Sequence, residues 1–369
     1  MHVLLTVNAA WNVRNFRWPV LRALIDRGDR VTVLAPPDHT VAEIEAAGAS
    51  FLPLRMRQAG LGPADNLGLA VQMHRALARE RPDVVLSWTI KTNILGALSA
   101  RRLGIPFIPN VSGLGTAFLS GSALRLAAHA LYRAAFARLD TVFFQNNEDL
   151  ALFVEERLVR REAATLLPGS GIDLERFRAE PLPGGTPVFL MVARLLGDKG
   201  VREFVDAARI VRQHHPAARF RLVGDTAPAN RTSIPASTIA DWRSEGAVEM
   251  PGPVDDVRPE IAAAHCVVLP SYREGAPRTL IEGAAMARPL IATDVPGCRA
   301  VVDGGRTGLL CKPRDPVSLA DACIAMLAME PRARAEMGAL GRAKMVEEYD
   351  ERRVVAAYMA AIDKARGAA

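Results

Sequence analysis

The sequence alternates short apolar runs with longer stretches of helical periodicity, and this alternation limits the folds open to the chain. Strands separated by helices are typical of βαβ units, whose strands form a parallel sheet covered by helices. The pattern therefore predicts an α/β fold. In the first half the expected strands are 3–7, 30–34, 83–88, 106–111 and 141–145, with helical patterns at 13–27, 67–80, 93–103 and 123–139.

A second alternating series follows a stretch rich in proline and glycine at 180–187, which can continue neither a helix nor a sheet. A chain of 369 residues is long enough for two domains. We predict two Rossmann-like parallel-sheet domains, at 1–180 and 181–345, facing a central cleft, and a C-terminal helix at 346–369 that returns to the first domain. The strands expected in the second domain are 188–192, 219–223, 248–250, 266–269, 289–292 and 309–311.

The charge balance indicates the kind of partner to expect. The formal net charge is +6 and the isoelectric point about 9.4, which favours anionic partners such as phosphates. With four Tyr, four Trp and no run of like charges, a nucleic-acid groove is not predicted. The four cysteines lie in the second half without a Cys-x-x-Cys pair, so we expect buried free thiols.

The N-terminal residues read as a strand rather than a signal peptide, and no run reaches about 18 uninterrupted apolar residues. We therefore expect a cytoplasmic protein. The helical stretch 123–139 carries Arg125, His129, Arg133 and Arg138 but no acidic residue. Such a helix can lie on anionic lipid at the inner membrane, or it can be a surface helix packed on the sheet. Both interpretations stay open.

The strongest motif is the segment 271–282, where a loop after a strand leads into a helix. Backbone N–H groups at a helix start can hold a phosphate. Glu274 lies in the loop and Glu282 about one turn inside the helix, so the two carboxylates can face one ligand, and carboxylates suit vicinal sugar hydroxyls. The alternative makes Glu274 a solvated loop residue and Glu282 a charge favoured by the helix dipole.

A second motif follows the first strand of the second domain, where Arg194 and Lys199 lie five residues apart on a loop. Two cations on such a loop suit a diphosphate, because they can neutralise the charge that develops on a leaving group. The alternative is a pair of exposed surface cations.

A third motif, at 109–118, contains Gly113 and Gly115 after a first-domain strand. Phe118 stands where a dinucleotide fingerprint has its last glycine, so NAD binding is not predicted. The glycines can let the backbone approach a ligand closely, or they can form a plain tight turn.

Several motifs are missing from the sequence. It has no Asp-x-Asp pair, no histidines at metal-ligand spacing, no Gly-x-Ser-x-Gly and no Walker loop. These absences favour a reaction that uses neither a bound metal nor a cofactor.

These residues together resemble GT-B glycosyltransferases of family 4 over nearly the whole chain. Glu274 and Glu282 match the family's E-x7-E motif, Arg194 and Lys199 match its diphosphate-binding pair, and 167–177 is similar to its interdomain stretch. The resemblance implies that Glu274, Arg194 and Lys199 carry catalysis. It implies donor binding by Glu282, Gly275, Ala276, Pro277, Thr279, Leu280, Gly252, Pro253 and Val254. The acceptor is expected near Asn8, Asn12, Arg14, Ser112, Gly113, Gly115 and Thr116.

The segments 88–93, 110–118 and 269–278 also resemble a bacterial subgroup that adds N-acetylhexosamine to sugars on undecaprenyl diphosphate. The chain departs from the family in one respect, because 111–118 lacks the histidine that many members place near the donor sugar. That departure puts a histidine-assisted step in doubt.

The leading hypothesis is a retaining, metal-independent transferase that moves a sugar from a UDP-sugar donor to a lipid-linked saccharide acceptor. One alternative is a nucleotide-sugar epimerase of the same two-domain fold, which needs no acceptor. Another is a non-catalytic nucleotide-sugar-binding subunit of an assembly complex, which binds UDP without turnover.

Overall fold

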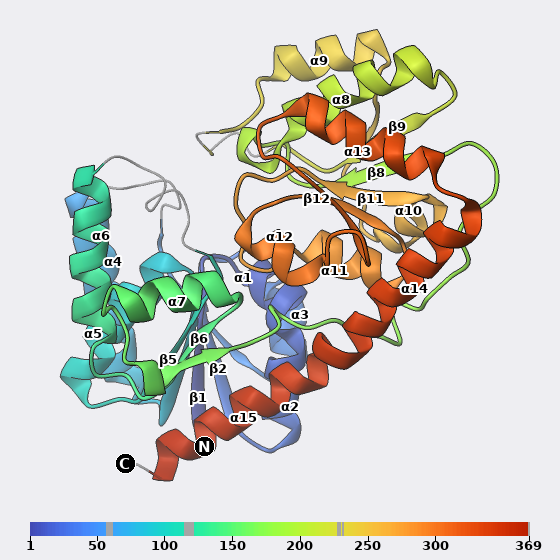
Figure 1. The fold of residues 1–369 in the computed structure, drawn as a ribbon. Coiled ribbons are helices and arrows are strands. Elements are labelled where there is room, and N and C mark those ends of the chain that lie inside the picture. Colours follow the sequence, from blue (N-terminus) through green and yellow to red (C-terminus); the bar gives the residue numbers. More distant parts are fainter. Residues whose placement is uncertain (57–61, 114–121, 227–229, 231, 368–369) are drawn as a thin grey trace. The chain divides into compact units, whose positions relative to one another are not determined.

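The computed structural model describes residues 1–56, 62–113, 122–226, 230 and 232–367 (Figure 1). The chain forms two compact units. Unit 1 comprises Met1–Gly171 and Glu351–Ala369, and unit 2 comprises Ile172–Asp350. Each unit is an α/β structure built on a parallel sheet, so the predicted fold class is confirmed.

The chain passes from unit 1 to unit 2 before the stretch rich in proline and glycine. The Ile172 N–H donates to the Tyr349 carbonyl at 2.8 Å, and Phe177 is buried in the core of unit 2. The buried Arg288 guanidinium donates to the carbonyls of Glu180 and Pro181 at 3.0 and 2.9 Å. The start of the segment expected to link the domains is therefore hydrogen-bonded to unit 2. The boundaries of unit 2 lie at Ile172 and Asp350, so the expected boundaries at 180 and 345 both fall within that unit.

The sheet of unit 1 has seven strands among the described residues, all parallel, in the order β3-β2-β1-β4-β5-β6-β7. The middle strands are almost wholly buried, which fits their continuous apolar sequence. The strands are β1 His2–Thr6, β2 Arg30–Ala35, β3 Ser50–Pro53, β4 Val84–Trp88, β5 Phe107–Val111, β6 Val142–Phe144 and β7 Ala164–Leu166.

Helices cover both faces of this sheet. The C-terminal helix α15 (Glu351–Gly367) packs with α2 (Trp18–Asp26) on one face, where Tyr358 is fully buried (Figure 1). The other face carries α4 (Pro63–Glu80), α5 (Ile90–Leu103), α6 (Ser122–Phe136) and α7 (Asn147–Glu155). The remaining helical segments are α1 Ala10–Asn12, the π-helix η1 Val13–Arg17, α3 Val41–Ala46 and the 3-10 turn η3 Arg161–Ala163.

The sheet of unit 2 has six parallel strands among the described residues, in the order β10-β9-β8-β11-β12-β13. They are β8 Val188–Val192, β9 Arg219–Val223, β10 Glu249–Gly252, β11 Cys266–Leu269, β12 Leu290–Thr293 and β13 Gly308–Cys311. The helical segments are η4 Gly197–Lys199, α8 Val201–His214, α9 Ala236–Glu245, α10 Arg258–Ala263, α11 Arg278–Ala285, α12 Pro296–Val301, α13 Pro316–Ala328 and α14 Pro331–Glu348.

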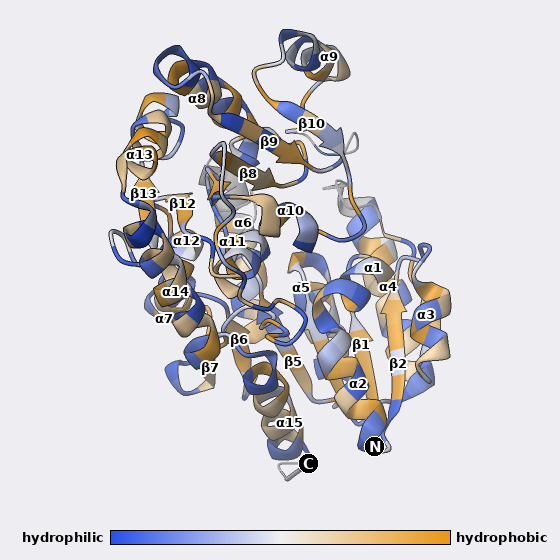
Figure 2. Ribbon diagram, turned by 90° about the vertical axis from the view of Figure 1, so that its right-hand side faces the viewer, coloured by the Kyte–Doolittle hydropathy of each residue, from blue (hydrophilic) through white to orange (hydrophobic). Residues whose placement is uncertain are grey.

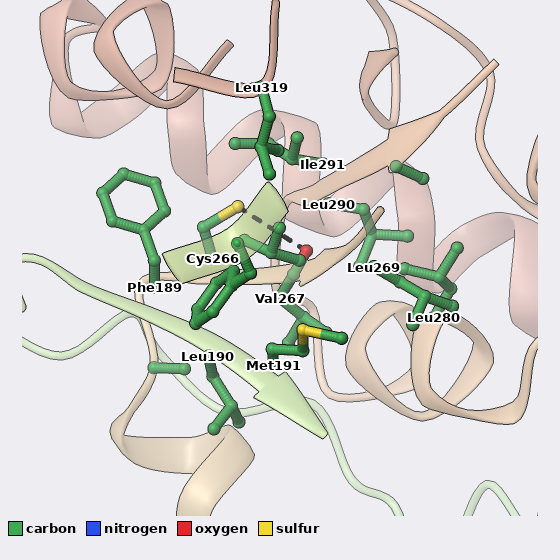
Figure 3. Close-up of a cluster of buried hydrophobic side chains, with 14 of the residues drawn as sticks. Phe189, Leu190, Met191, Cys266, Val267, Leu269, Leu280, Leu290, Ile291 and Leu319 are labelled. Carbon is green, nitrogen blue, oxygen red and sulfur yellow. Dashed lines mark hydrogen bonds between the residues drawn. The ribbon is translucent and has the colours of Figure 1, made fainter. Parts of the chain in front are cut away.

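The core of unit 2 is continuous and apolar. Leu280 of α11 and Leu319 of α13 pack with strand residues such as Leu190 and Ile291 (Figure 3). In Figure 2 apolar colour dominates β1, β2, β8 and β9, whereas the helices also carry hydrophilic residues. All four cysteines are buried and free, as predicted, and the Cys266 thiol donates only to the Val267 carbonyl at 3.7 Å (Figure 3).

Candidate functional site

Two loops of unit 2 meet at the carboxyl ends of neighbouring strands, where open α/β sheets bind ligands. One loop follows β8 and ends at Gly200, and the other follows β11. The Tyr272 N–H donates to the Asp198 carbonyl at 2.9 Å. A Cβ on Gly200, whose φ is +74°, would lie 2.1 Å from the Pro270 carbonyl oxygen. Only glycine allows this approach, so the close contact of the two loops is built into the sequence.

Lys199 and Glu274 form an ion pair across these loops. The Lys199 Nζ lies 2.6 Å from Oε1 of Glu274, with 23 % and 12 % of the two side chains exposed. A charge-assisted bond of this length in a partly buried place is a strong one. The structure therefore brings together two predicted site residues that are 75 positions apart in the sequence.

Glu282, the second predicted carboxylate, lies on α11, where Nε of Arg278 donates to its Oε1 at 2.8 Å. Only 12 % of its side chain is exposed. Burial raises the pKa of Glu282 above its usual range, although the nearby Arg278 and Arg176 guanidinium groups act in the opposite direction. Glu282 therefore holds a proton more readily than an exposed glutamate does.

The start of α11 is fastened to β8, because the Thr279 hydroxyl donates to the Val192 carbonyl at 2.8 Å. The Thr279 N–H has no acceptor among the residues that the structure describes. Leu280 is placed differently from the expectation. Its side chain is fully buried and its N–H already donates to the Pro277 carbonyl at 3.1 Å. Thr279 rather than Leu280 thus has an amide to offer an anion.

The turn before α11 is tightly packed. Gly275 and Pro277 are buried, and Ala276 packs on the core of unit 2. Gly297, at the start of α12, lies so close that its Cβ would be 2.4 Å from the Glu274 carbonyl oxygen. The turn that carries Glu274 therefore packs against Gly297 and against the core of unit 2.

Arg194 begins the loop after β8 and is exposed. No carboxylate partner for it exists within the described ranges. The same loop is braced by a neighbour, since the Thr232 hydroxyl donates to Oδ1 of Asp198 at 2.8 Å and the Gly197 N–H donates to the Thr232 carbonyl at 2.7 Å. Arg194 is thus a cation of the loop whose charge is available to a ligand.

Gly252 is the last residue of β10, which lies two strands away from β8, and Pro253 and Val254 follow it. Gly252 has a φ of +97°, and its carbonyl accepts from the Gly224 N–H at 3.1 Å. Gly224 in turn lies against the Ala193 carbonyl, where a Cβ would come within 1.9 Å. The loops after β10, β9, β8 and β11 consequently form one connected edge of the sheet.

In unit 1, the predicted residues after β1 and β5 also lie at carboxyl ends of strands. Asn12 Nδ2 donates to Asn8 Oδ1 at 3.3 Å, and Arg14 pairs with Glu43. Ser112 and Gly113 directly follow β5 and are half-buried. Gly115 and Thr116 lie outside the described residues.

A buried polar network at these strand ends was not found by sequence reasoning. The Tyr358 hydroxyl of α15 accepts from Trp88 Nε1 at 2.7 Å and from Asn110 Nδ2 at 2.8 Å. Gln145 Nε2 donates to Asn110 Oδ1 at 3.2 Å. The backbone of Thr89, which follows Trp88, has a φ of +81°, an unusual value for a β-branched residue. The C-terminal helix thus fixes the ends of β4 and β5.

The described residues of each unit line a cavity. The one in unit 1 has a volume of about 560 Å³ and lies at the amino ends of β5 and β6, away from the strand ends described above. The one in unit 2, of about 480 Å³, is lined by residues that include Arg176 and Asp256, whose charges act on Glu282. Neither is lined by Lys199 or Glu274.

The described residues contain neither a metal-binding cluster nor a membrane-spanning helix. No group of three or more His, Cys, Asp or Glu side chains there is arranged to hold a metal ion. None of the helices in that part of the chain combines the length and the apolar character needed to cross a bilayer.

Two parallel-sheet units with cations and carboxylates at strand ends are typical of GT-B glycosyltransferases. Residues 16–169 match the family model described as a glycosyl transferase 4-like domain, and residues 186–329 match the model described as glycosyl transferases group 1. Together the two models leave out only the ends of the chain and 170–185. The protein belongs to this glycosyltransferase family, and the resemblance seen in its motifs is confirmed.

Two curated relatives act on lipid-linked sugars. The N,N'-diacetylbacillosaminyl-diphospho-undecaprenol alpha-1,3-N-acetylgalactosaminyltransferase of Campylobacter jejuni is 26% identical over 97% of each chain. The UDP-Gal:alpha-D-GlcNAc-diphosphoundecaprenol alpha-1,3-galactosyltransferase of Escherichia coli is 25% identical over 76% of this chain and 75% of its own.

Solved structures share the fold at low sequence identity. Anabaena Alr3699/HepE, in complex with UDP and glucose, matches with a TM-score of 0.78 and 17% identity over 98% of this chain and 99% of its own. The sucrose-phosphate synthase of Thermosynechococcus elongatus matches with a TM-score of 0.80 and 19% identity over 100% of both chains.

Proposed function

We propose that this glycosyltransferase moves a sugar, N-acetylhexosamine, from a UDP-sugar to a saccharide carried on a lipid diphosphate, with retention at the anomeric carbon. The pathway would be the synthesis of a surface polysaccharide or glycan. The observation that carries the proposal is the Lys199–Glu274 pair on two adjoining strand-end loops. The two relatives support the acceptor class, because both are named for undecaprenyl-diphosphate-linked sugars.

The diphosphate of the donor would be held by the loop after β8 and the start of α11. Lys199 and Arg194 supply two positive charges, and the Thr279 N–H supplies a donor at a helix start. These groups stabilise the negative charge that grows on the departing UDP, which is the main electrostatic demand of the transfer.

The two carboxylates would hold the sugars of the donor. Oε1 of Glu274 is bound to Lys199, which leaves Oε2 to accept from a hydroxyl of the transferred sugar. Glu282 would accept from the ribose hydroxyls. The Gly252–Val254 segment and the Gly275–Pro277 turn would line the nucleotide and the sugar.

Retention can proceed without a histidine base. The bond between C1 of the sugar and the β-phosphate oxygen breaks, and the acceptor hydroxyl attacks C1 from the same face. Its proton passes to the departing phosphate oxygen, so the leaving group itself serves as the base. The acceptor would bind unit 1 near Asn8, Asn12, Arg14 and Ser112–Gly113.

We also propose that unit 1 makes peripheral contact with the cytoplasmic face of the membrane. Helix α6 packs on the core through Tyr132 and Phe136, so that part of its surface is a structural face. Leu126 and Leu131 nevertheless stay 73 % and 47 % exposed on α6, and Leu67 is 68 % exposed on α4. Exposed leucines on helices with cationic residues favour the interface of an anionic bilayer.

The experiment that tests the main proposal mixes the protein with UDP-N-acetylhexosamines and short-chain polyprenyl-diphosphate sugars. The expected result is an extended lipid-linked glycan with an α-linkage. Incubation of the donor alone identifies an epimerase by the appearance of an epimer. Binding of UDP without any turnover would identify a non-catalytic subunit.

A further inference from the structure

Trp11 is the one tryptophan among the described residues with an exposed side chain. It lies in α1, in the turn that follows β1, and 45 % of it is exposed. Trp88 and Trp242 are buried. Exposure of an indole to water is unfavourable, because burial of so large an apolar surface would lower the free energy.

The exposed indole is held in place rather than left loose. The backbone N–H of Trp11 donates to Asp38 Oδ2 at 2.7 Å, and its backbone carbonyl accepts from Asn15 Nδ2 at 2.9 Å. The ring meets the edge of Phe16 at a centroid distance of 5.3 Å and an angle of 85°. A ring fixed in this way loses little conformational entropy when a ligand covers it.

The groups around Trp11 are amides and carboxylates. Asn8 lies just before α1, Asn12 ends α1 and Asn15 lies in η1, and the Asp38 carboxylate accepts from the Trp11 backbone N–H. The nearby Arg14 is occupied, since it pairs with Glu43 and lies 4.7 Å from the centroid of the Trp18 ring. An anionic lipid surface would need available cations here, whereas amide and carboxylate groups match the hydroxyls of a sugar.

We propose that the Trp11 indole is the platform on which a pyranose ring of the acceptor saccharide stacks. The C–H groups on the apolar face of a pyranose carry a partial positive charge, and they pack on the electron-rich face of an aromatic ring. The neighbouring amides would bind the equatorial hydroxyls of the same sugar. This inference rests on the proposed function and names the residue that recognises its acceptor class.

The test compares Trp11→Ala and Trp11→Phe with wild type, using a water-soluble short-chain acceptor and no vesicles. Trp11→Ala is expected to raise the acceptor KM on the order of fivefold to tenfold and to leave the UDP affinity unchanged. Trp11→Phe keeps an aromatic face, so it should raise the acceptor KM less than Trp11→Ala does. Trp18→Phe is the matched control, and thermal melting checks that each variant folds.

An unchanged acceptor KM in Trp11→Ala overturns the inference. A loss that appears only when vesicles are present also overturns it, because Trp11 would then contact the membrane. Quenching of tryptophan fluorescence by the acceptor, present in wild type and absent in Trp11→Phe, supports the platform independently of turnover. If wild type binds this acceptor through Trp11 but transfers nothing, the proposed function fails while the inference about Trp11 stands.

Discussion

The ammonium group of Lys199 lies 2.6 Å from Oε1 of Glu274 and joins the loops that follow two neighbouring strands, β8 and β11. Lys199→Ala removes the cation proposed to contact the donor diphosphate and leaves Glu274 without its ion-pair partner. We expect UDP affinity to fall on the order of tenfold to a hundredfold, as for the loss of a bond to a charged group. Calorimetric titration of UDP measures this loss.

Lys344→Ala is the matched control for that substitution. Lys344 Nζ lies at the same distance of 2.6 Å from Oδ1 of Asp303 in the same unit, away from the two loops. This variant should keep the UDP affinity of wild type. An equal loss in both variants would show that Lys199 acts only through stability.

The raised pKa of Glu282 predicts a dependence of donor binding on pH. The ionised carboxylate accepts hydroxyl bonds, so UDP affinity should fall as the pH drops through the pKa of Glu282, which lies above its usual 4.5. Because the folded state binds this proton more tightly than the unfolded state, the Glu282 contribution to stability decreases as the pH rises through the same range. Glu282→Gln should remove the pH dependence of UDP affinity and of stability that Glu282 causes, and it should weaken UDP binding at neutral pH. UDP titrations and thermal melts at several pH values, with Gln and wild type side by side, check this.

Gly200→Ala tests the contact between the two loops. The added Cβ would meet the Pro270 carbonyl oxygen at 2.1 Å, at a φ of +74°. Gly246→Ala provides the control, since Gly246 has a φ of +70° and nothing within 4 Å of the added Cβ. Both variants carry the strain of a left-handed alanine, roughly 1 kcal/mol. Gly200→Ala should unfold at a clearly lower denaturant concentration than Gly246→Ala and should also lose UDP affinity; equal midpoints in the two variants would contradict a steric clash at Gly200.

Tyr358→Phe tests whether α15 positions the strand ends of unit 1. The substitution leaves the buried donors of Trp88 and Asn110 unsatisfied, which costs about 1–3 kcal/mol for each. We expect lower stability and a higher acceptor KM with unchanged UDP affinity. Tyr349→Phe, which removes a bond to the Ala300 carbonyl in unit 2, is the comparison. It should lower stability without raising the acceptor KM.

Replacing Leu126 and Leu131 together by Gln tests the proposed membrane contact. Both side chains are exposed on α6, so the protein should melt as wild type does. Sedimentation with vesicles containing phosphatidylglycerol should decrease several-fold, because apolar area at the bilayer interface is lost. Val317→Asn, at an exposed position of unit 2, should sediment as wild type. Undiminished sedimentation of the α6 variant would exclude this helix as the contact.

The sequence predicted the buried strands of both units and the edge strands of unit 2, but it missed the two edge strands of unit 1. β3 and β7 lie at the two edges of the unit 1 sheet and are short and partly exposed. An edge strand needs no continuous apolar run, so its periodicity is too weak to identify. The stretch at 180–187 was expected to link the domains, and its start is hydrogen-bonded to Arg288 of unit 2 at Glu180 and Pro181. A segment rich in proline and glycine can therefore also pack against a domain.

Much of the candidate site could be chosen from the sequence, but its contacts could not. Glu274 and Lys199 were both singled out by motif and by their positions after strands. Their pairing depends on β8 lying beside β11, an order that differs from the order along the chain. The contact between Tyr358 and Asn110 spans 248 residues, and no local pattern indicates it.

The return of α15 has a consequence for how the protein is made. Residues Glu351–Gly367 are synthesised after unit 2, yet they belong to unit 1 and complete its structure. A nascent or prematurely terminated chain would leave the indole of Trp88 and the amide of Asn110 without their common partner. The earlier part of unit 1 therefore lacks this partner until α15 has been made, and chains truncated before α15 should be substrates for chaperones and proteases.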